Sequence, residues 1–238
     1  TDEELEQFES YLSENRFGAL KNDTEVYTTF EGDNTILMNL VAKNRLSEFR
    51  NQFGEMNAVS LFNYVVDQAK TSITYKNPFA TRNTDENHLA DPEFHLHAFQ
   101  FREKEILASA AKRIKKLLDS GLDSFDAFNI AQHHLINVGQ AYLERVVLEQ
   151  FQLQIETTND KGSQAILSKL CQLYALSTIE KNASWYLEQG YMEGVKTKAI
   201  RKAVNQLCWE IRQNAVPLVH AFNIPESCLS APIVTKKK

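Results

Sequence analysis

Apolar residues recur at intervals of three and four positions over long stretches of this chain, and this spacing most restricts its fold. It places apolar side chains on one face of an α-helix, whereas a half-buried strand would alternate apolar and polar residues. Only 8 glycines and 5 prolines occur in 238 residues, so few residues interrupt the helices. The sequence therefore predicts an all-α protein.

The first part of the chain predicts two helices. One begins at Asn34 and has Ile36, Leu37 and Leu40 among its apolar positions, and another covers residues 57–72. A polar stretch with two prolines follows, which favours a linker. The predicted division of the chain is a first helical unit at residues 1–75, a linker at residues 76–90 and a second helical unit at residues 91–238.

The second part predicts four long helices. Asp91 can cap the first of them and Pro92 fits its first turn, while Pro217 should end or bend the last. Long helices with short connections pack most readily as an antiparallel bundle. The predicted helices cover residues 92–119, 124–151, 164–187 and 196–222.

Charge and hydropathy exclude several classes of function. The formal net charge is −5, and the basic residues are scattered among the acids, so polyanion binding, including nucleic acid, is not expected as the main role. No apolar run approaches the roughly 20 residues of a membrane span. The chain starts with TDEELEQFES, which lacks the apolar core of a secretory signal, and ends in TKKK rather than Ser-Lys-Leu. No targeting signal is visible.

Neither the histidines nor the cysteines form a metal-binding pattern. His95 and His97 are two positions apart and His133 and His134 are adjacent, so the members of each pair point in different directions on a helix. No metal site is predicted. The three cysteines are widely spaced and odd in number, and each lies among apolar residues, which predicts buried thiols in a reducing compartment. They are Cys171, Cys208 and Cys228.

The segment TTFEGDNTILMNLVAK, residues 28–43, contains the one carboxylate whose position suggests chemistry. Residues 28–30 favour extended backbone, Gly32 permits a turn, and Asn34 or Thr35 can cap the following helix. Glu31 on such a turn would be held in place. The residues alone leave two interpretations open: Glu31 is functional, or it is a surface charge beside a helix cap formed by Asp33 and Asn34.

This segment resembles the catalytic-glutamate segment of the acyl-CoA oxidases, flavoproteins of the acyl-CoA dehydrogenase superfamily, in which Tyr/Phe-Glu-Gly-Asp-Asn precedes a helix. The upstream YLSENRFGALKNDTEVY also resembles that family. So do NHLADPEFHLHAFQFRE, LCQLYALSTIEK and RQNAVPLVHAFNIPESCLSAPI, which are similar to its C-terminal helical domain. The likeness covers nearly the whole chain. It implies the end of the acyl-CoA dehydrogenase-like helical domain followed by an antiparallel helical bundle.

The resemblance also implies an activity and a site. Glu31 corresponds to the base that removes the α-proton of a fatty acyl-CoA, and Gly32 lets the substrate approach the backbone. The cofactor is FAD, which takes the β-hydrogen and is reoxidised by molecular oxygen, so that trans-2-enoyl-CoA and hydrogen peroxide form. Asp33, Asn34 and Thr35 correspond to positions that lie against the FAD. A homodimer is expected.

The resemblance covers only a C-terminal portion, which leads to further expectations. The N-terminal helical domain and the β-domain of the family have no counterpart here, so the isolated chain should be inactive and should bind FAD weakly. Two alternatives remain, a non-catalytic helical dimerisation or interaction module and an acyl-CoA dehydrogenase. The expected compartment is the peroxisome for a eukaryotic protein and the cytoplasm for a bacterial one.

Overall fold

The structure is a computed structural model that describes residues 12–54, 78–229 and 231–232. Within these ranges every regular element is a helix and none is a strand, which confirms the all-α prediction. The helix predicted at residues 57–72 lies outside the described residues. The chain divides into two compact units, each described here by itself. They are Thr1–Leu37 with Gln213–Lys238, called the first unit, and Met38–Arg212, called the second unit.

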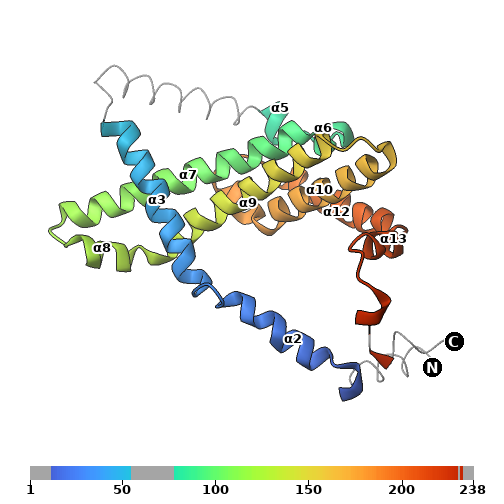
Figure 1. The fold of residues 1–238 in the computed structure, drawn as a ribbon. Coiled ribbons are helices and arrows are strands. Elements are labelled where there is room, and N and C mark those ends of the chain that lie inside the picture. Colours follow the sequence, from blue (N-terminus) through green and yellow to red (C-terminus); the bar gives the residue numbers. More distant parts are fainter. Residues whose placement is uncertain (1–11, 55–77, 230, 233–238) are drawn as a thin grey trace. The chain divides into compact units, whose positions relative to one another are not determined.

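Four long helices form the framework of the second unit. Helix α7 packs against α9 and α10, and α10 packs against α9 and α12. Consecutive long helices run in opposite directions (Figure 1), as in an antiparallel bundle. The helices of this unit are α5 (Pro78–Thr81), α6 (Glu86–Ala90), α7 (Pro92–Asp119), α8 (Ser124–Ile130), α9 (Gln132–Glu156), α10 (Lys161–Lys181), α11 (Ala183–Glu188) and α12 (Gly194–Arg212), together with most of α3 (Asn34–Gly54).

The helix predicted from Pro92 is confirmed at both ends. The Asp91 side chain accepts a hydrogen bond from the Glu93 amide at 2.9 Å, as an N-cap does. The helix ends at Asp119, and Gly121 follows with a φ of +92°, a backbone conformation that glycine adopts without strain. Residues 76–90, predicted as a linker, contain two short helices, α5 and α6.

The other three long helices are each interrupted where the sequence predicts continuity. The second breaks at Ala131 into α8 and α9, and the third breaks at Asn182 into α10 and α11. The fourth ends at Arg212, ahead of Pro217, which lies inside the short helix α13 (Ala215–His220). Ala131, at the first of these breaks, is fully buried in the core of the second unit.

Helices α3, α7 and α9 share one apolar core in the second unit. At its centre α3 crosses α9 with unusually close backbones. A Cβ atom added to Gly139 of α9 would lie 2.6 Å from the carbonyl oxygen of Met38, so only glycine fits there without a shift. The fully buried residues of this core include Ala42, Ala131 and Val138, with Leu107, Ala110, Ile114 and Leu135 around them.

Buried ion pairs join the same three helices. Glu103 of α7, only 6% exposed, accepts from Arg45 of α3 at 2.9 Å and also pairs with Arg145 of α9. The two guanidinium groups lie on the ring of Tyr142, at 4.8 and 5.3 Å from its centroid. One carboxylate is therefore shared by two guanidinium groups that stack on one aromatic ring.

Replacing Glu103 by alanine is expected to cost up to about 3 kcal/mol of unfolding free energy. Arg45 and Arg145 would lose their shared, buried acid and keep only Glu48 and Glu149, which are more exposed. Glu48 supplies a matched control, since it pairs with the same Arg45 but is exposed. Glu48→Ala should cost less than about 1 kcal/mol. Urea unfolding measures both values. Equal losses in the two variants would contradict this assignment of the stabilising pair.

The first unit is formed by η1 (Ser13–Asn15), α2 (Phe17–Glu25), η2 (Val26–Thr28), the start of α3, α13 and η3 (Glu226–Cys228). None of the residues of α2, η2 and α13 is buried. Exposed apolar side chains are therefore frequent in this unit, and they include Phe17, Leu20, Tyr27, Phe30, Val216 and Phe222.

Surface features follow the sequence predictions in part. Cys171 is buried, but Cys208 and Cys228 are exposed, so the prediction of three buried thiols is wrong for two of them.

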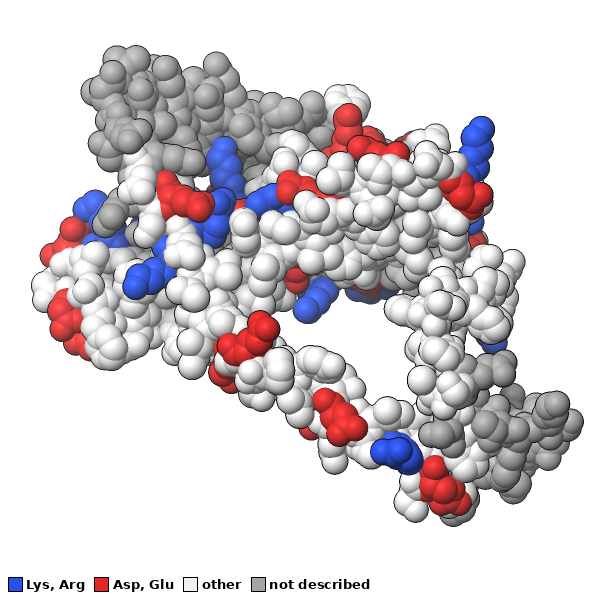
Figure 2. Space-filling view, in the orientation of Figure 1, with Lys and Arg blue, Asp and Glu red and all other residues white. Residues whose placement is uncertain are grey.

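On the face shown in Figure 2, acidic and basic side chains are interspersed over the second unit. Of the helices in the described ranges, none is both long and apolar enough to span a membrane.

Candidate active site

The Phe-Glu-Gly-Asp-Asn segment forms a turn that leads into α3. The predicted extended backbone at residues 28–30 is wrong, since Val26–Thr28 is a 3-10 helix and a turn follows it. The amide of Gly32 donates to the carbonyl of Thr29 at 3.1 Å. Gly32 has a φ of +121°, which any residue with a side chain adopts only with strain. The glycine therefore sets the direction in which the chain enters the helix.

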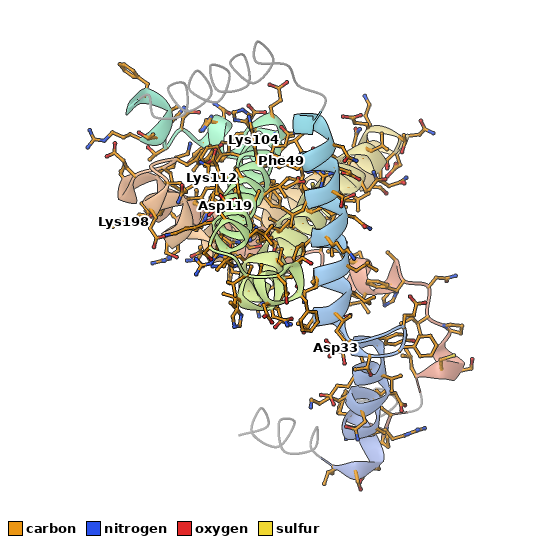
Figure 3. The ribbon with its side chains drawn as sticks, turned by 90° about the vertical axis from the view of Figure 1, so that its left-hand side faces the viewer. Asp33, Phe49, Lys104, Lys112, Asp119 and Lys198 are labelled. Carbon is orange, nitrogen blue, oxygen red and sulfur yellow. The ribbon has the colours of Figure 1, made fainter. Side chains whose placement is uncertain are left out.

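Asp33 caps α3; the sequence offered Asn34 or Thr35 as the cap, and Asp33 with Asn34 in the alternative interpretation. Its Oδ1 atom accepts from the amides of Thr35 at 2.8 Å and Ile36 at 3.4 Å. Asn34 is the first helical residue, and Figure 3 shows Asp33 directly ahead of the helix. A carboxylate at this position satisfies free amides and complements the positive end of the helix dipole.

The carboxylate of Glu31 is exposed, and it forms no hydrogen bond or ion pair with another residue in the part of the chain that the structure describes. Its neighbours Phe30 and Tyr27 are 71% and 76% exposed. The turn fixes the backbone of the five predicted site residues, 31–35, but these residues alone build no enclosed pocket. General-base chemistry on carbon needs a site from which water is excluded.

A second cluster of titratable groups, which the sequence did not point to, surrounds Lys196 of α12. This lysine is 2% exposed. Its Nζ atom donates to the Ala80 carbonyl at 3.0 Å, lies 2.9 Å from Nε2 of His88, and lies 4.1 Å from the centroid of the Phe94 ring. Burial lowers the pKa of Lys196 to about 8. The cluster ties α5 and α6 to α12 through a cation.

His88 must stay neutral to accept a hydrogen bond from Lys196. Burial, and after it the charge of Lys196, lower the pKa of His88 below its ordinary value of 6.5. A group whose pKa is lower in the folded chain than in the unfolded chain gives stability that is complete above the unfolded pKa. That stability is lost as the pH falls through the folded pKa.

Acidification from pH 7 to pH 5 is therefore expected to lower the Tm of the second unit, and His88→Gln should make this dependence shallower. The glutamine can accept from Lys196 through its amide oxygen, but it does not titrate. Thermal unfolding at a series of pH values measures the effect. His220→Gln, at an exposed position in α13, is the control and should leave the slope unchanged. An identical slope in the His88 and His220 variants would argue against this role.

Across the described ranges, no three His, Cys, Asp or Glu residues come together in a group that could hold a metal ion. His95 is 1% exposed and its Nε2 donates to the Leu89 carbonyl at 2.7 Å, which gives this histidine a structural partner. The titratable groups of the described chain therefore offer two arrangements of interest, the carboxylate turn ahead of α3 and the Lys196 cluster.

The chain belongs to the acyl-CoA oxidase family. The model of that family, described as "Acyl-CoA oxidase", matches residues 91–236, which is more than half of the chain. The predicted family is thereby confirmed.

Individual relatives agree with this assignment. The peroxisomal acyl-coenzyme A oxidase 2 of Arabidopsis thaliana is 34% identical over 223 residues, which are 94% of this chain and 32% of that protein. The fold resembles crystal structures of acyl-CoA oxidase 1 from Yarrowia lipolytica (TM-score 0.77, 22% identity, 94% of this chain and 31% of that one). It also resembles acyl-CoA oxidase-2 from Caenorhabditis elegans bound with FAD, ascaroside-CoA and ATP (TM-score 0.69, 18% identity, 87% and 29%). The chain spans about a third of the length of these relatives.

Proposed function

We propose that this chain is the C-terminal portion of an FAD-dependent acyl-CoA oxidase and supplies the catalytic base. In this proposal the complete enzyme converts a fatty acyl-CoA into trans-2-enoyl-CoA and reduces molecular oxygen to hydrogen peroxide, a step of fatty acid β-oxidation. The observation that carries the proposal is the turn at Glu31, set by the positive φ of Gly32 and the cap of Asp33, in a chain of the acyl-CoA oxidase family.

Glu31 would act as a general base on the carbon beside the thioester. This C–H bond is weakly acidic, so a carboxylate must be aligned with it and shielded from water. Glu31 accepts the α-proton and becomes neutral. Gly32 presents no side chain, so the acyl thioester can approach the backbone closely. Bound FAD supplies the acceptor for the β-hydrogen and passes its electrons to oxygen.

The residues after Glu31 fit a contact with FAD in part. Asn34 and Thr35 are exposed at the start of α3, and their polar side chains suit ribose and phosphate groups. The carboxylate of Asp33 accepts hydrogen bonds from two amides of its own helix. We therefore assign Asp33 the role of orienting the residues that would contact FAD. The structure of the Caenorhabditis elegans relative contains FAD, which supports the choice of cofactor.

The proposal includes a homodimer and a peroxisomal compartment. Large apolar side chains of the first unit, such as Tyr27 and Phe30, are exposed in this chain. Exposed apolar side chains in such number mark an interaction surface, which supports the proposal that the rest of an oxidase and a second copy cover them. The Arabidopsis thaliana relative is named as peroxisomal. Mass measurement of the complete enzyme tests the dimer, and a monomer at micromolar concentration would reject it.

A chimera tests the activity. This chain replaces the matching residues of the Arabidopsis thaliana oxidase, and the product is assayed for FAD content and for peroxide release with fatty acyl-CoA. Peroxide formation that requires both acyl-CoA and oxygen is the expected result. A folded, FAD-loaded chimera that binds acyl-CoA but releases no peroxide would reject the proposal. Reduction of an electron-carrier flavoprotein in place of oxygen would instead identify a dehydrogenase.

A second candidate is a non-catalytic helical interaction module. The observation that favours it is the core of the second unit, which α3, α7 and α9 close among themselves without the turn at Glu31. Absorbance of the purified chain discriminates the two candidates, because oxidised flavin absorbs at about 450 nm. A chain that takes up FAD from solution speaks for the oxidase. A colourless chain that is also inert in the chimera speaks for the module.

A further inference from the structure

A groove in the second unit is lined by apolar side chains from three helices and has a volume of about 530 Å³. Helix α3 contributes one wall, α7 the facing wall and α8 one side. The volume lies in the range of small-molecule sites, roughly 300–1,000 Å³. The apolar lining is formed by Leu46, Phe49, Ala111, Ile114, Leu118 and Phe128; we call it the α3–α7–α8 groove.

The lining of this groove is continuous with the apolar core. Phe49 and Phe128 pack against the core formed by α3, α7 and α9, and Ile114 belongs to that core. Leu118 remains 42% exposed. The groove therefore opens from the core to the surface and leaves apolar side-chain area accessible to a ligand.

Lysines from the facing helices border the apolar lining. Lys43 belongs to α3 and Lys115 to α7. Lys115 pairs with Asp119 at 2.6 Å, whereas Lys43 is exposed and forms no ion pair with another described residue. Figure 3 labels Phe49 on α3 and Asp119 on α7, the two helices that contribute these walls. The charges of these three polar residues sum to one positive charge, which favours an anion.

We infer that the α3–α7–α8 groove binds a medium- to long-chain fatty acid, with its alkyl chain on the apolar lining and its carboxylate beside Lys43. None of the described lining residues is a buried polar group that an alkyl chain would leave without a partner, and the charge of Lys43 complements the one charge of the ligand. The described residues that line the groove all belong to the second unit, and Glu31 is not among them. This site is therefore additional to the proposed catalytic one.

Titration calorimetry of the full chain with fatty acids of increasing length tests the inference. Decanoate, dodecanoate and tetradecanoate are used below their micellar concentrations. Each added methylene should tighten the Kd about two- to fourfold, as expected when the chain extends over an apolar surface. Dodecanol and dodecyltrimethylammonium have the same tail without the anion, and they should bind at least tenfold more weakly than dodecanoate.

Four variants locate the site. Ala111→Phe fills the groove and should abolish binding, and Lys43→Glu should weaken dodecanoate binding at least tenfold. Lys112→Glu is the charge-matched control, because this exposed lysine of α7 does not line the groove. The Kd of this variant for dodecanoate should stay within twofold. Leu118→Asp, at an exposed position, replaces Ala111→Phe if that variant fails to fold.

Several results would overturn the inference. They are a complete lack of binding, equal affinity for dodecanoate and dodecanol, and unchanged affinity in both Ala111→Phe and Leu118→Asp. Self-association of the chain that these two variants abolish in the absence of fatty acid would assign the groove to a second copy instead. The test measures binding only, so its outcome is independent of peroxide release by the chimera.

Discussion

Replacing Glu31 by glutamine in a complete, FAD-loaded enzyme that carries this chain should lower the rate of acyl-CoA oxidation roughly 10²–10⁴-fold, the usual contribution of a general base. The amide has the size of the carboxylate and can still donate and accept hydrogen bonds, but it cannot take a proton from carbon. Peroxide release under air, together with reduction of the bound flavin by acyl-CoA without oxygen, measures the effect. The flavin step should slow as much as the overall rate.

Two further variants separate the role of Glu31 from a general effect of charge. Glu31→Asp keeps the carboxylate but shortens its reach by one methylene, so its rate should lie between those of the unaltered and glutamine enzymes. Glu25→Gln removes an exposed acid of the same unit whose one ion pair among the described residues is with Lys21, and it should leave the rate unchanged. Unimpaired flavin reduction by Glu31→Gln would show that another group removes the proton.

Replacing Gly139 by alanine should destabilise the second unit by about 1–3 kcal/mol, the usual cost of forcing extra volume into a packed core. The new methyl group would lie 2.6 Å from the Met38 carbonyl oxygen. That oxygen belongs to the backbone of α3, so the whole helix must move. In a free helix the same change would stabilise by up to about 1 kcal/mol, because alanine is the better helix former. The expected sign is therefore opposite to the helix propensity.

Gly18→Ala provides the control for this prediction. Gly18 also lies in a helix, α2, and a Cβ atom there would have nothing within 4 Å. Its Tm should be unchanged or slightly higher, while that of Gly139→Ala should fall. Thermal unfolding monitored by circular dichroism compares the Tm of the two variants, and urea unfolding gives the free-energy difference. A Gly139→Ala chain as stable as the unaltered one would mean that α3 and α9 do not approach each other so closely.

Sequence patterns predicted those parts of the fold that local chemistry decides. The cap at Asp91, the start at Pro92 and the end of α7 before Gly121 all rest on residues adjacent to the boundary. The break at Ala131 does not, because alanine favours a helix and gives no local signal for an interruption; this residue is fully buried in the core. The contrast separates local from tertiary control of helix ends.

The candidate site shows the same division. Gly32 predicted a turn, and the structure has one. The residues before it form a 3-10 helix and a turn, where the sequence predicted extended backbone. The role of Glu31 came from resemblance to a family, since an exposed carboxylate has no local pattern that marks a base. The sequence did not predict the cluster around Lys196, because its partners Ala80 and His88 lie more than 100 positions away in the sequence.

The contact between Gly139 and Met38 has a mechanical consequence for the second unit. Side chains that separate most helix pairs can change rotamer and let one helix slide past the other, but here two main chains meet directly. Residues 38–54 of α3 and the helix α9 are therefore expected to translate and rotate as a single rigid piece. Any rearrangement that shifts one of them must carry the other along.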